Sequence, residues 1–267
     1  MRLTRIAGVV SAFALTTVLA LTGAGAASAE PLAATGYVAL GDSYSSGVGS
    51  GSYDSASGNC KRSTKAYPQL WAAAHAPSSF AFTACSGART DDVLAGQLGP
   101  LNSATGLVSI SIGGNDAGFG DTMSTCALSS ESECLAALAT AGSYISSTLG
   151  GRLDTVYAAI SAKAPAAHVV VLGYPRLYKL DGSCVVGLSE KERSTINATA
   201  DALDSVIAQR AAAHGFSFGD VRTAFTGHEI CSGSAWLHSV TLPVDESYHP
   251  TATGQSSGYL PVFQSLA

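Results

Sequence analysis

The chain has 267 residues, of which 46% are hydrophobic and only 12% are charged, and its formal net charge is −5. A negative charge with so few basic residues argues against nucleic acid and anionic membranes as electrostatic partners. The length suits one α/β domain with a sizeable core, although length alone would also allow two domains.

The first 29 residues have the pattern of a secretory signal peptide. Arg2 and Arg5 precede an apolar run, and an A-x-A cleavage site ends at Ala29. No later stretch reaches the roughly 20 apolar residues that a membrane-spanning helix needs. We therefore expect export with removal of residues 1–29, leaving residues 30–267 as a single extracellular domain without a membrane anchor. Loss of the two arginines makes the mature net charge −7.

Short apolar runs alternate with amphipathic patterns along the mature chain. The runs predict strands over residues 37–40, 80–83, 107–112, 169–172 and 216–218. The first and fourth are apolar throughout, which is typical of parallel strands buried on both faces. This alternation predicts a three-layer α/β/α sandwich of the doubly wound, flavodoxin-like type, with a mostly parallel five-stranded sheet.

The amphipathic patterns predict three helices, over residues 67–76, 153–164 and 190–214. Ser189 and Glu192 resemble a capping box at the start of the last helix. Two further segments are interpreted as surface loops, residues 47–59 and 123–134.

Six cysteines all follow the predicted cleavage site. An even number of cysteines in an exported chain indicates disulfides. Zinc is the competing interpretation, but the sequence has no C-x-x-C motif and no Cys/His cluster, so we expect neither a metal nor a cofactor. Six cysteines allow 15 connectivities. The simplest is the sequential one, with pairs Cys60–Cys85, Cys126–Cys134 and Cys184–Cys231.

Glycine-flanked polar positions follow three of the predicted strands, at Ser43, Gly87 and Asn115. Ligands of such sheets bind beyond the carboxyl ends of the strands, so these positions should converge there. A serine at a strand-to-helix turn exposes its hydroxyl beside the N–H groups of the new helix. An isolated Gly-Asp-Ser is more often only a helix cap.

Asn115 follows two glycines and supplies an uncharged amide donor suited to an oxyanion, although a tight turn would explain the same residues. Asp42 and Asp116 flank the two candidate residues, and we expect them to make structural hydrogen bonds. His249 lies close to the C-terminus and is followed by a proline.

These residues together resemble the blocks of the GDSL/SGNH hydrolase family. Ser43 matches the first block, Gly87 the second, Asn115 the third and His249 the last. The resemblance covers essentially the whole mature chain and is closest to secreted lipases and esterases of filamentous actinobacteria. Those enzymes also carry three sequential disulfides.

The resemblance implies that Ser43 is a nucleophile and His249 its general base. The oxyanion would be held by the N–H groups of Ser43 and Gly87 and by the amide of Asn115. The third triad member is usually an aspartate three residues before the histidine, and here that position is Glu246. Some relatives orient the histidine with a backbone carbonyl instead, which here would be that of Ser247.

The expected function is a carboxylic-ester hydrolase, a lipase or esterase acting on ester or lipid substrates as a monomer. Phospholipase A1 and acyl-thioesterase activity are alternatives on the same machinery. A polysaccharide deacetylase is disfavoured because few aromatic residues are present to stack on sugars. A catalytically inactive binding domain on a hydrolase fold is the alternative outside enzymes.

Overall fold

A computed structural model describes Met1 and residues 35–267, and residues 35–267 belong to one compact unit. The signal peptide predicted over residues 1–29 lies outside the described residues, except for Met1. None of the helices that the structure describes is long and apolar enough to cross a membrane.

Five strands form one sheet in the order β2-β1-β3-β4-β5, and every neighbouring pair is parallel. The apolar runs of the sequence therefore form the strands that they predict, with bounds shifted by one or two residues. The central strands are buried because helices cover both faces of the sheet. The strands are β1 (Gly36–Gly41), β2 (Ser79–Phe82), β3 (Thr105–Ser111), β4 (His168–Leu172) and β5 (Ser217–Gly219).

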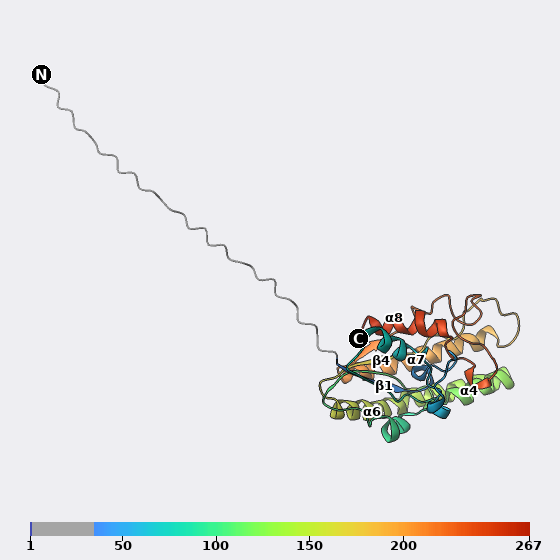
Figure 1. Ribbon diagram of the computed structural model, residues 1–267. Helices are drawn as coiled ribbons and strands as arrows, with labels where there is room; N and C mark the ends of the chain where they lie inside the picture. Colours follow the sequence, from blue (N-terminus) through green and yellow to red (C-terminus); the bar gives the residue numbers. More distant parts are fainter. Residues whose placement is uncertain (2–34) are drawn as a thin grey trace. The chain divides into compact units, whose positions relative to one another are not determined.

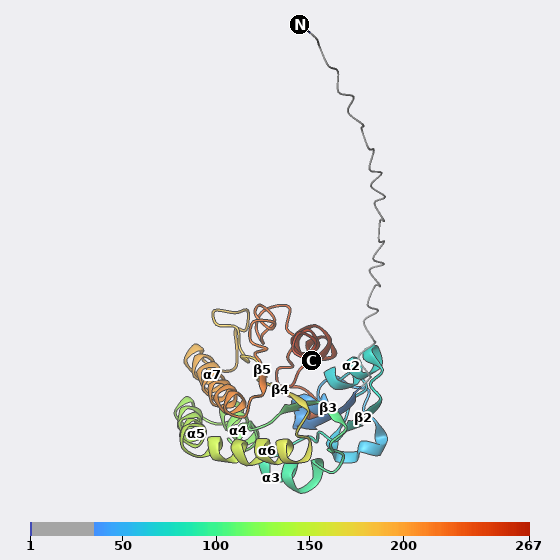
Figure 2. The ribbon, with the colours of Figure 1, turned by 90° about the vertical axis from the view of Figure 1, so that its left-hand side faces the viewer.

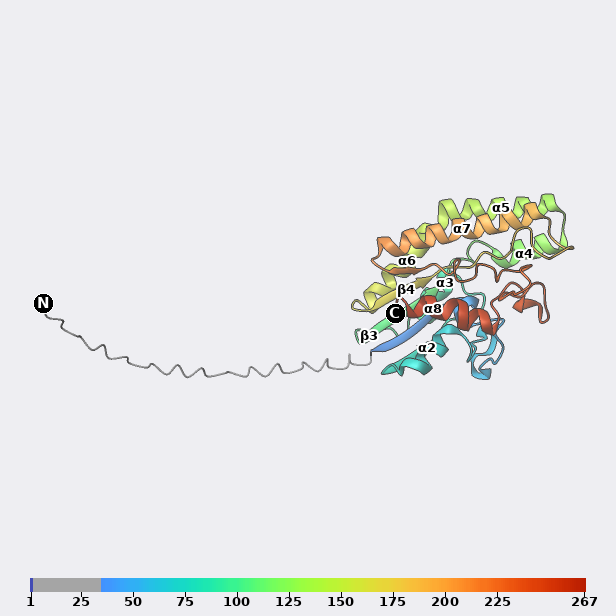
Figure 3. The same cartoon turned by 90° about the horizontal axis from the view of Figure 1, so that it is seen from above.

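Helices lie on both sides of this sheet, as the predicted three-layer sandwich requires. Figures 2 and 3 show α2 and α8 on one side, and α5, α6 and α7 on the other. The α-helices are α1 (Ser43–Ser46), α2 (Tyr67–His75), α3 (Thr90–Asp92), α4 (Phe119–Leu128), α5 (Glu131–Tyr144), α6 (Gly150–Lys163), α7 (Glu190–Ala213) and α8 (Leu260–Gln264). Short 3₁₀ turns span Ser55–Cys60 and Val244–Glu246, and π-helical turns span Val93–Gln97, Ile145–Leu149 and Gly254–Tyr259.

The three predicted helices are α2, α6 and α7. The capping box at the start of α7 is formed: the Ser189 N–H donates to Glu192 Oε2 at 2.7 Å, and the Glu192 N–H donates to Ser189 Oγ at 3.2 Å. These two bonds satisfy backbone donors that the first turn of a helix otherwise leaves unpaired.

The interpretation of residues 123–134 as a surface loop is wrong. The segment holds the end of α4 and the start of α5 (Figure 1). Met123 and Cys126 are buried, so α4 has a core-facing side. A second capping box, between Ser130 and Glu133, starts α5. That motif is visible in the sequence, but the cysteines and serines around it resemble the composition of a loop.

The turn between β1 and α1 depends on a glycine. Gly41 has φ = 123°, and a Cβ at this position would lie 2.4 Å from the carbonyl oxygen of Ser111. A side chain would therefore be strained by its backbone conformation and would also collide with β3. The Gln97 side chain holds the turn by accepting from the Gly41 N–H at 2.7 Å and donating to its carbonyl at 2.8 Å. The residues after Gly41 are thus held over the end of the sheet.

The structure contains the three disulfides of the sequential connectivity, and no cysteine among the described residues is free. They join the segment before α2 to the loop after β2, α4 to α5, and the loop before α7 to the loop after β5. The pairs are Cys60–Cys85, Cys126–Cys134 and Cys184–Cys231, with sequence separations of 25, 8 and 47 residues.

Loop length predicts how much each disulfide stabilises the fold. In the chain-entropy model, replacing Cys184 and Cys231 by alanine lowers the free energy of unfolding by about 4 kcal/mol, and replacing Cys126 and Cys134 by about 2.5 kcal/mol. The longer loop has more conformational freedom to lose in the unfolded chain. Urea unfolding of the two double variants measures this difference. A larger loss in the Cys126/Cys134 variant would contradict the expectation.

Candidate active site

Ser43 and His249, the two ends of the predicted catalytic pair, are in direct contact. Ser43 is the first residue of α1, and His249 reaches it from a segment 206 residues later. The distance from Ser43 Oγ to His249 Nε2 is 2.7 Å. The His249 segment is held by an antiparallel bridge between Leu237 and Pro250 and by the His238 N–H, which donates to the His249 carbonyl at 2.9 Å.

The second ring nitrogen of His249 determines its tautomer. Nδ1 lies 3.0 Å from the carbonyl oxygen of Ser247. A carbonyl oxygen can only accept, so the proton belongs on Nδ1, and Nε2 is left to accept from the Ser43 hydroxyl. The backbone carbonyl therefore orients the ring as a triad carboxylate would, without contributing a full charge.

Glu246 does not occupy the position that a third triad member needs. Its Oε1 accepts a hydrogen bond from the Tyr53 hydroxyl at 2.7 Å. The turn Val244–Glu246 directs this side chain away from the ring and presents the Ser247 carbonyl instead. The assignment of Glu246 as a catalytic acid is thus not supported by the geometry. Asp245 does not replace it, because it is paired with Lys61.

Burial controls the protonation of His249. Desolvation lowers the pKa of its imidazole to about 4, against raising contributions from the Ser247 carbonyl and from Asp245. The ring is neutral at any pH well above that value, so its Nε2 lone pair is available to the Ser43 hydroxyl over most of the pH range.

Three predicted oxyanion donors come from separate strand ends. Among the described residues, no acceptor is found for the N–H of Ser43 or of Gly87. The Asn115 side chain donates one amide hydrogen to the Ala88 carbonyl at 3.0 Å, which leaves its second amide hydrogen unused. This bond also ties the loop that holds Gly87 to the end of β3.

The residue before Ser43, Asp42, has a buried carboxylate. Asp42 accepts from the Tyr44 N–H at 3.0 Å, from Ser111 Oγ at 2.7 Å and from the Tyr174 hydroxyl. Burial raises the pKa of Asp42 to about 6, while these hydrogen bonds act in the opposite direction. The expectation that Asp42 makes structural hydrogen bonds is confirmed.

Tyr174 links this carboxylate to the oxyanion side of the site. Its hydroxyl donates to Asp42 and accepts from the Gly114 N–H at 3.2 Å, and its own backbone N–H donates to Asp204 at 2.8 Å. Tyr44 supports the other side: its hydroxyl donates to the Tyr248 carbonyl at 2.7 Å. Sequence reasoning did not identify either tyrosine, because neither lies in a motif that distinguishes it from other buried tyrosines.

Asp116 has a similar structural role next to Asn115. Its carboxylate accepts from the Thr90 N–H at 3.0 Å and from Thr90 Oγ1 at 2.5 Å, which holds α3 against the end of β3. Among the described residues, no group of three or more His, Cys, Asp or Glu side chains could hold a metal ion.

An apolar pocket extends from Ser43. Its polar end is formed by Ser43, Gly114 and Asn115. The rest is lined by side chains from α4, α5, α7 and the segment after β4, among them Met123, Leu138, Ile145, Ile196, Leu177 and Leu203. The sequence did not predict this pocket because α4 and the start of α5 were interpreted as a loop.

Residues 39–256 match the GDSL-like Lipase/Acylhydrolase family, and the chain belongs to this family. It is 69% identical to Lipase 1 of Streptomyces coelicolor, over the full length of both chains. The structure is similar to the crystal structure of an extracellular lipase from Streptomyces rimosus, with a TM-score of 0.86 and 70% identity. It is also similar to that of a phospholipase A1 from Streptomyces albidoflavus, with a TM-score of 0.86 and 66% identity. Each match covers 88% of this chain and 100% of the other.

Two buried tyrosines allow the hydrogen bonds of Tyr174 to be tested with a matched control. Tyr174→Phe leaves Asp42 and the Gly114 N–H short of a partner, so we expect the free energy of unfolding to fall by about 1–3 kcal/mol and kcat to fall with it. Tyr157 is also buried, but its hydroxyl has no hydrogen-bond partner in the described chain. Tyr157→Phe should therefore leave stability unchanged or raised.

Urea unfolding and ester-hydrolysis kinetics of the two variants measure both effects. Equal losses of stability in the two variants would contradict the assigned role of Tyr174. A Tyr174→Phe variant with unchanged kcat would show that its network does not position the reacting groups.

Proposed function

We propose that this protein is a secreted serine carboxylic-ester hydrolase, a lipase or esterase, in which Ser43 is the nucleophile and His249 the general base. The observation that carries the proposal is the 2.7 Å contact between Ser43 Oγ and His249 Nε2 at the polar end of an apolar pocket. The identity to lipases supports the same reaction.

The first half of the reaction is acyl transfer to the enzyme. Ser43 Oγ attacks the ester carbonyl carbon while His249 Nε2 takes the hydroxyl proton. The negative charge on the carbonyl oxygen is stabilised by the N–H groups of Ser43 and Gly87 and by the free amide hydrogen of Asn115. The ester C–O bond then breaks, and His249 gives its proton to the departing alcohol.

The second half returns the enzyme to its starting state. Water attacks the acyl-Ser43 ester, His249 takes a proton from that water, and the carboxylic acid leaves as Ser43 Oγ is reprotonated. The imidazolium formed in each half donates from Nδ1 to the Ser247 carbonyl, which is 3.0 Å away. The Ser43–His249 pair therefore works as a dyad oriented by backbone.

The acyl chain occupies the apolar pocket. Its lining offers hydrocarbon contacts along α4, α5 and α7, and its polar groups gather at the end where Ser43 lies. This arrangement places an ester carbonyl at Ser43 when the chain is inserted. The apolar lining favours esters of long acyl chains as substrates over short acetyl esters.

Phospholipase A1 activity is a second candidate. The 66% identity to a phospholipase A1 of the same fold favours it. The acyl pocket would serve both. Secretion is supported by the predicted signal peptide, by the three disulfides and by the extracellular relative.

Ser43→Ala should abolish hydrolysis of p-nitrophenyl esters and of phosphatidylcholine while leaving the fold intact, because it removes one small hydroxyl. With the unchanged enzyme, kcat/KM should rise with acyl length as the chain fills the pocket. The measurement is a panel of p-nitrophenyl esters of increasing length beside the phospholipid. Substantial residual hydrolysis in Ser43→Ala would contradict the role of Ser43.

The geometry around His249 predicts that the Glu246 carboxylate can be replaced without a large loss of activity. Glu246→Gln should retain most of kcat, because Glu246 contacts Tyr53 and not the imidazole. The acid limb of kcat/KM should lie near pH 4, since the neutral ring is the active form and burial lowers its pKa to about 4. Glu246→Gln should not move this limb.

Asp245→Asn is the matched control, since Asp245 raises the pKa of His249 and its loss should shift the limb to still lower pH. The measurement is the pH dependence of kcat/KM for the three enzymes. A nearly inactive Glu246→Gln enzyme would restore Glu246 to the catalytic machinery.

A further inference from the structure

Six large aliphatic side chains are mostly exposed to solvent. Their exposed fractions run from 61% to 95%, and they are Leu128, Val185, Val186, Val240, Leu242 and Val244. Exposed aliphatic side chains are ordinary when scattered singly, but a group of them marks an interaction surface. We call this group the apolar rim.

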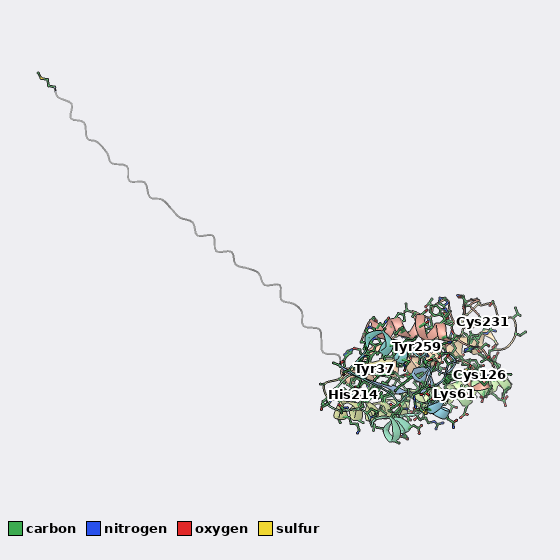
Figure 4. The ribbon with its side chains drawn as sticks, viewed as in Figure 1. Tyr37, Lys61, Cys126, His214, Cys231 and Tyr259 are labelled. Carbon is green, nitrogen blue, oxygen red and sulfur yellow. A yellow bond between two sulfur atoms is a disulfide. The ribbon has the colours of Figure 1, made fainter. Side chains whose placement is uncertain are left out.

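The rim residues belong together although they come from three segments. Val186 and Val240 line one surface pocket with Ala127, whose neighbour in α4 is Leu128. Cys126 and Cys231 also line this pocket, and Figure 4 shows both at the same end of the domain as Lys61, with Tyr37 and His214 at the other end. The rim is thus confined to one end of the domain.

That end holds the catalytic pair. Leu242 and Val244 lie in the segment that leads to His249, and Lys61 pairs with Asp245 of the same segment. The rim pocket and the acyl pocket are separate, but helices of the same set line both. The helix α4 contributes Met123 to the acyl pocket and Ala127 to the rim pocket, and α7 contributes residues to both.

The rim carries no charge of its own, and three of the carboxylates near it are paired with basic side chains. Asp245 pairs with Lys61, Glu131 with Lys191, and Glu190 with Arg193. The predicted mature chain has a net charge of −7. Anionic lipid would therefore be repelled by the chain as a whole, and nothing at the rim would attract it. Burial of hydrocarbon is the favourable term that this surface offers.

We infer that the apolar rim is an interfacial docking surface, which seats the enzyme on an electrically neutral lipid surface with the acyl pocket facing the lipid. The inference rests on the proposed ester hydrolysis, because only a substrate held in such a surface needs the rim. The rim side chains enter the lipid, and an acyl chain passes from it into the pocket without crossing water.

The test separates docking from hydrolysis by measuring binding in a Ser43→Ala background. Flotation with phosphatidylcholine vesicles gives the partition coefficient of this chain and of the same chain carrying Val185→Ser, Val186→Ser and Leu242→Ser. We expect the triple substitution to lower the partition coefficient by about tenfold or more, because three aliphatic side chains no longer enter the lipid. Neither added salt nor added phosphatidylglycerol should strengthen binding.

The matched control carries Val185→Leu, Val186→Leu and Leu242→Val, which keep the rim apolar and should keep the vesicle binding. In the Ser43 enzyme, the serine substitutions should leave hydrolysis of a soluble p-nitrophenyl ester unchanged while lowering hydrolysis of phosphatidylcholine vesicles. Thermal melting shows that each variant is folded.

Several outcomes would overturn the inference. They are equal vesicle binding with and without the serine substitutions, binding that requires phosphatidylglycerol and is lost in salt, and loss of binding in the leucine/valine control. A dimer in sedimentation that the serine substitutions convert to a monomer would assign the rim to a second copy of the chain. Failure of the proposed function is distinct, because it appears as soluble-ester hydrolysis that survives Ser43→Ala.

Discussion

The Asp42 carboxylate is the constraint on which the site depends. It is buried at the point where β1 becomes α1, and its hydrogen-bond donors come from α1, from the end of β3 and from the segment after β4. Burying a carboxylate without hydrogen bonds costs free energy of folding. Moving any of these donors away from Asp42 would therefore destabilise the fold, which keeps the donors in place. The ends of three neighbouring strands are thereby fixed relative to one another. Ser43, the next residue, takes its position from that arrangement.

The proposed Ser43–His249 dyad has a backbone carbonyl in place of a carboxylate. In a serine hydrolase the acid holds the imidazole in one tautomer and stabilises its charged form. Here the Ser247 carbonyl fixes the tautomer of His249. The dipole of the same carbonyl also stabilises the charged ring. The turn that presents this carbonyl is itself held by the hydrogen bond from the Tyr44 hydroxyl to the Tyr248 carbonyl. Tyr44 follows Ser43 in the chain, so one short segment contains the proposed nucleophile and also supports the loop of its proposed base.

The acyl pocket and the apolar rim are consequences of how α4 and α7 are placed. α4 follows β3 and ends near the disulfide Cys126–Cys134, whereas α7 begins near the disulfide Cys184–Cys231 and leads back to β5. Their inner faces line the pocket, and their ends carry or adjoin the rim. The disulfides tie the exposed ends of these segments to the core, because Cys126, Cys134 and Cys231 are buried in it. In this arrangement, one pair of helices provides both the site for a single acyl chain and a surface for an assembly of lipids.

The sequence by itself determined the positions of the five strands, the polar residues that follow three of them, and the longest helix. Apolar runs ending at Ser43, Gly87 and Asn115, and the capping box of α7, are local patterns whose meaning depends on neighbours in the chain. The tertiary structure alone decided which oxygen His249 faces, because Glu246 and Ser247 are adjacent and only the turn around them sets their directions. It also decided that residues 123–134 are helical, and that α4, α5 and α7 leave an apolar pocket between them. Those features depend on side chains far apart in the sequence, and no local pattern records such contacts.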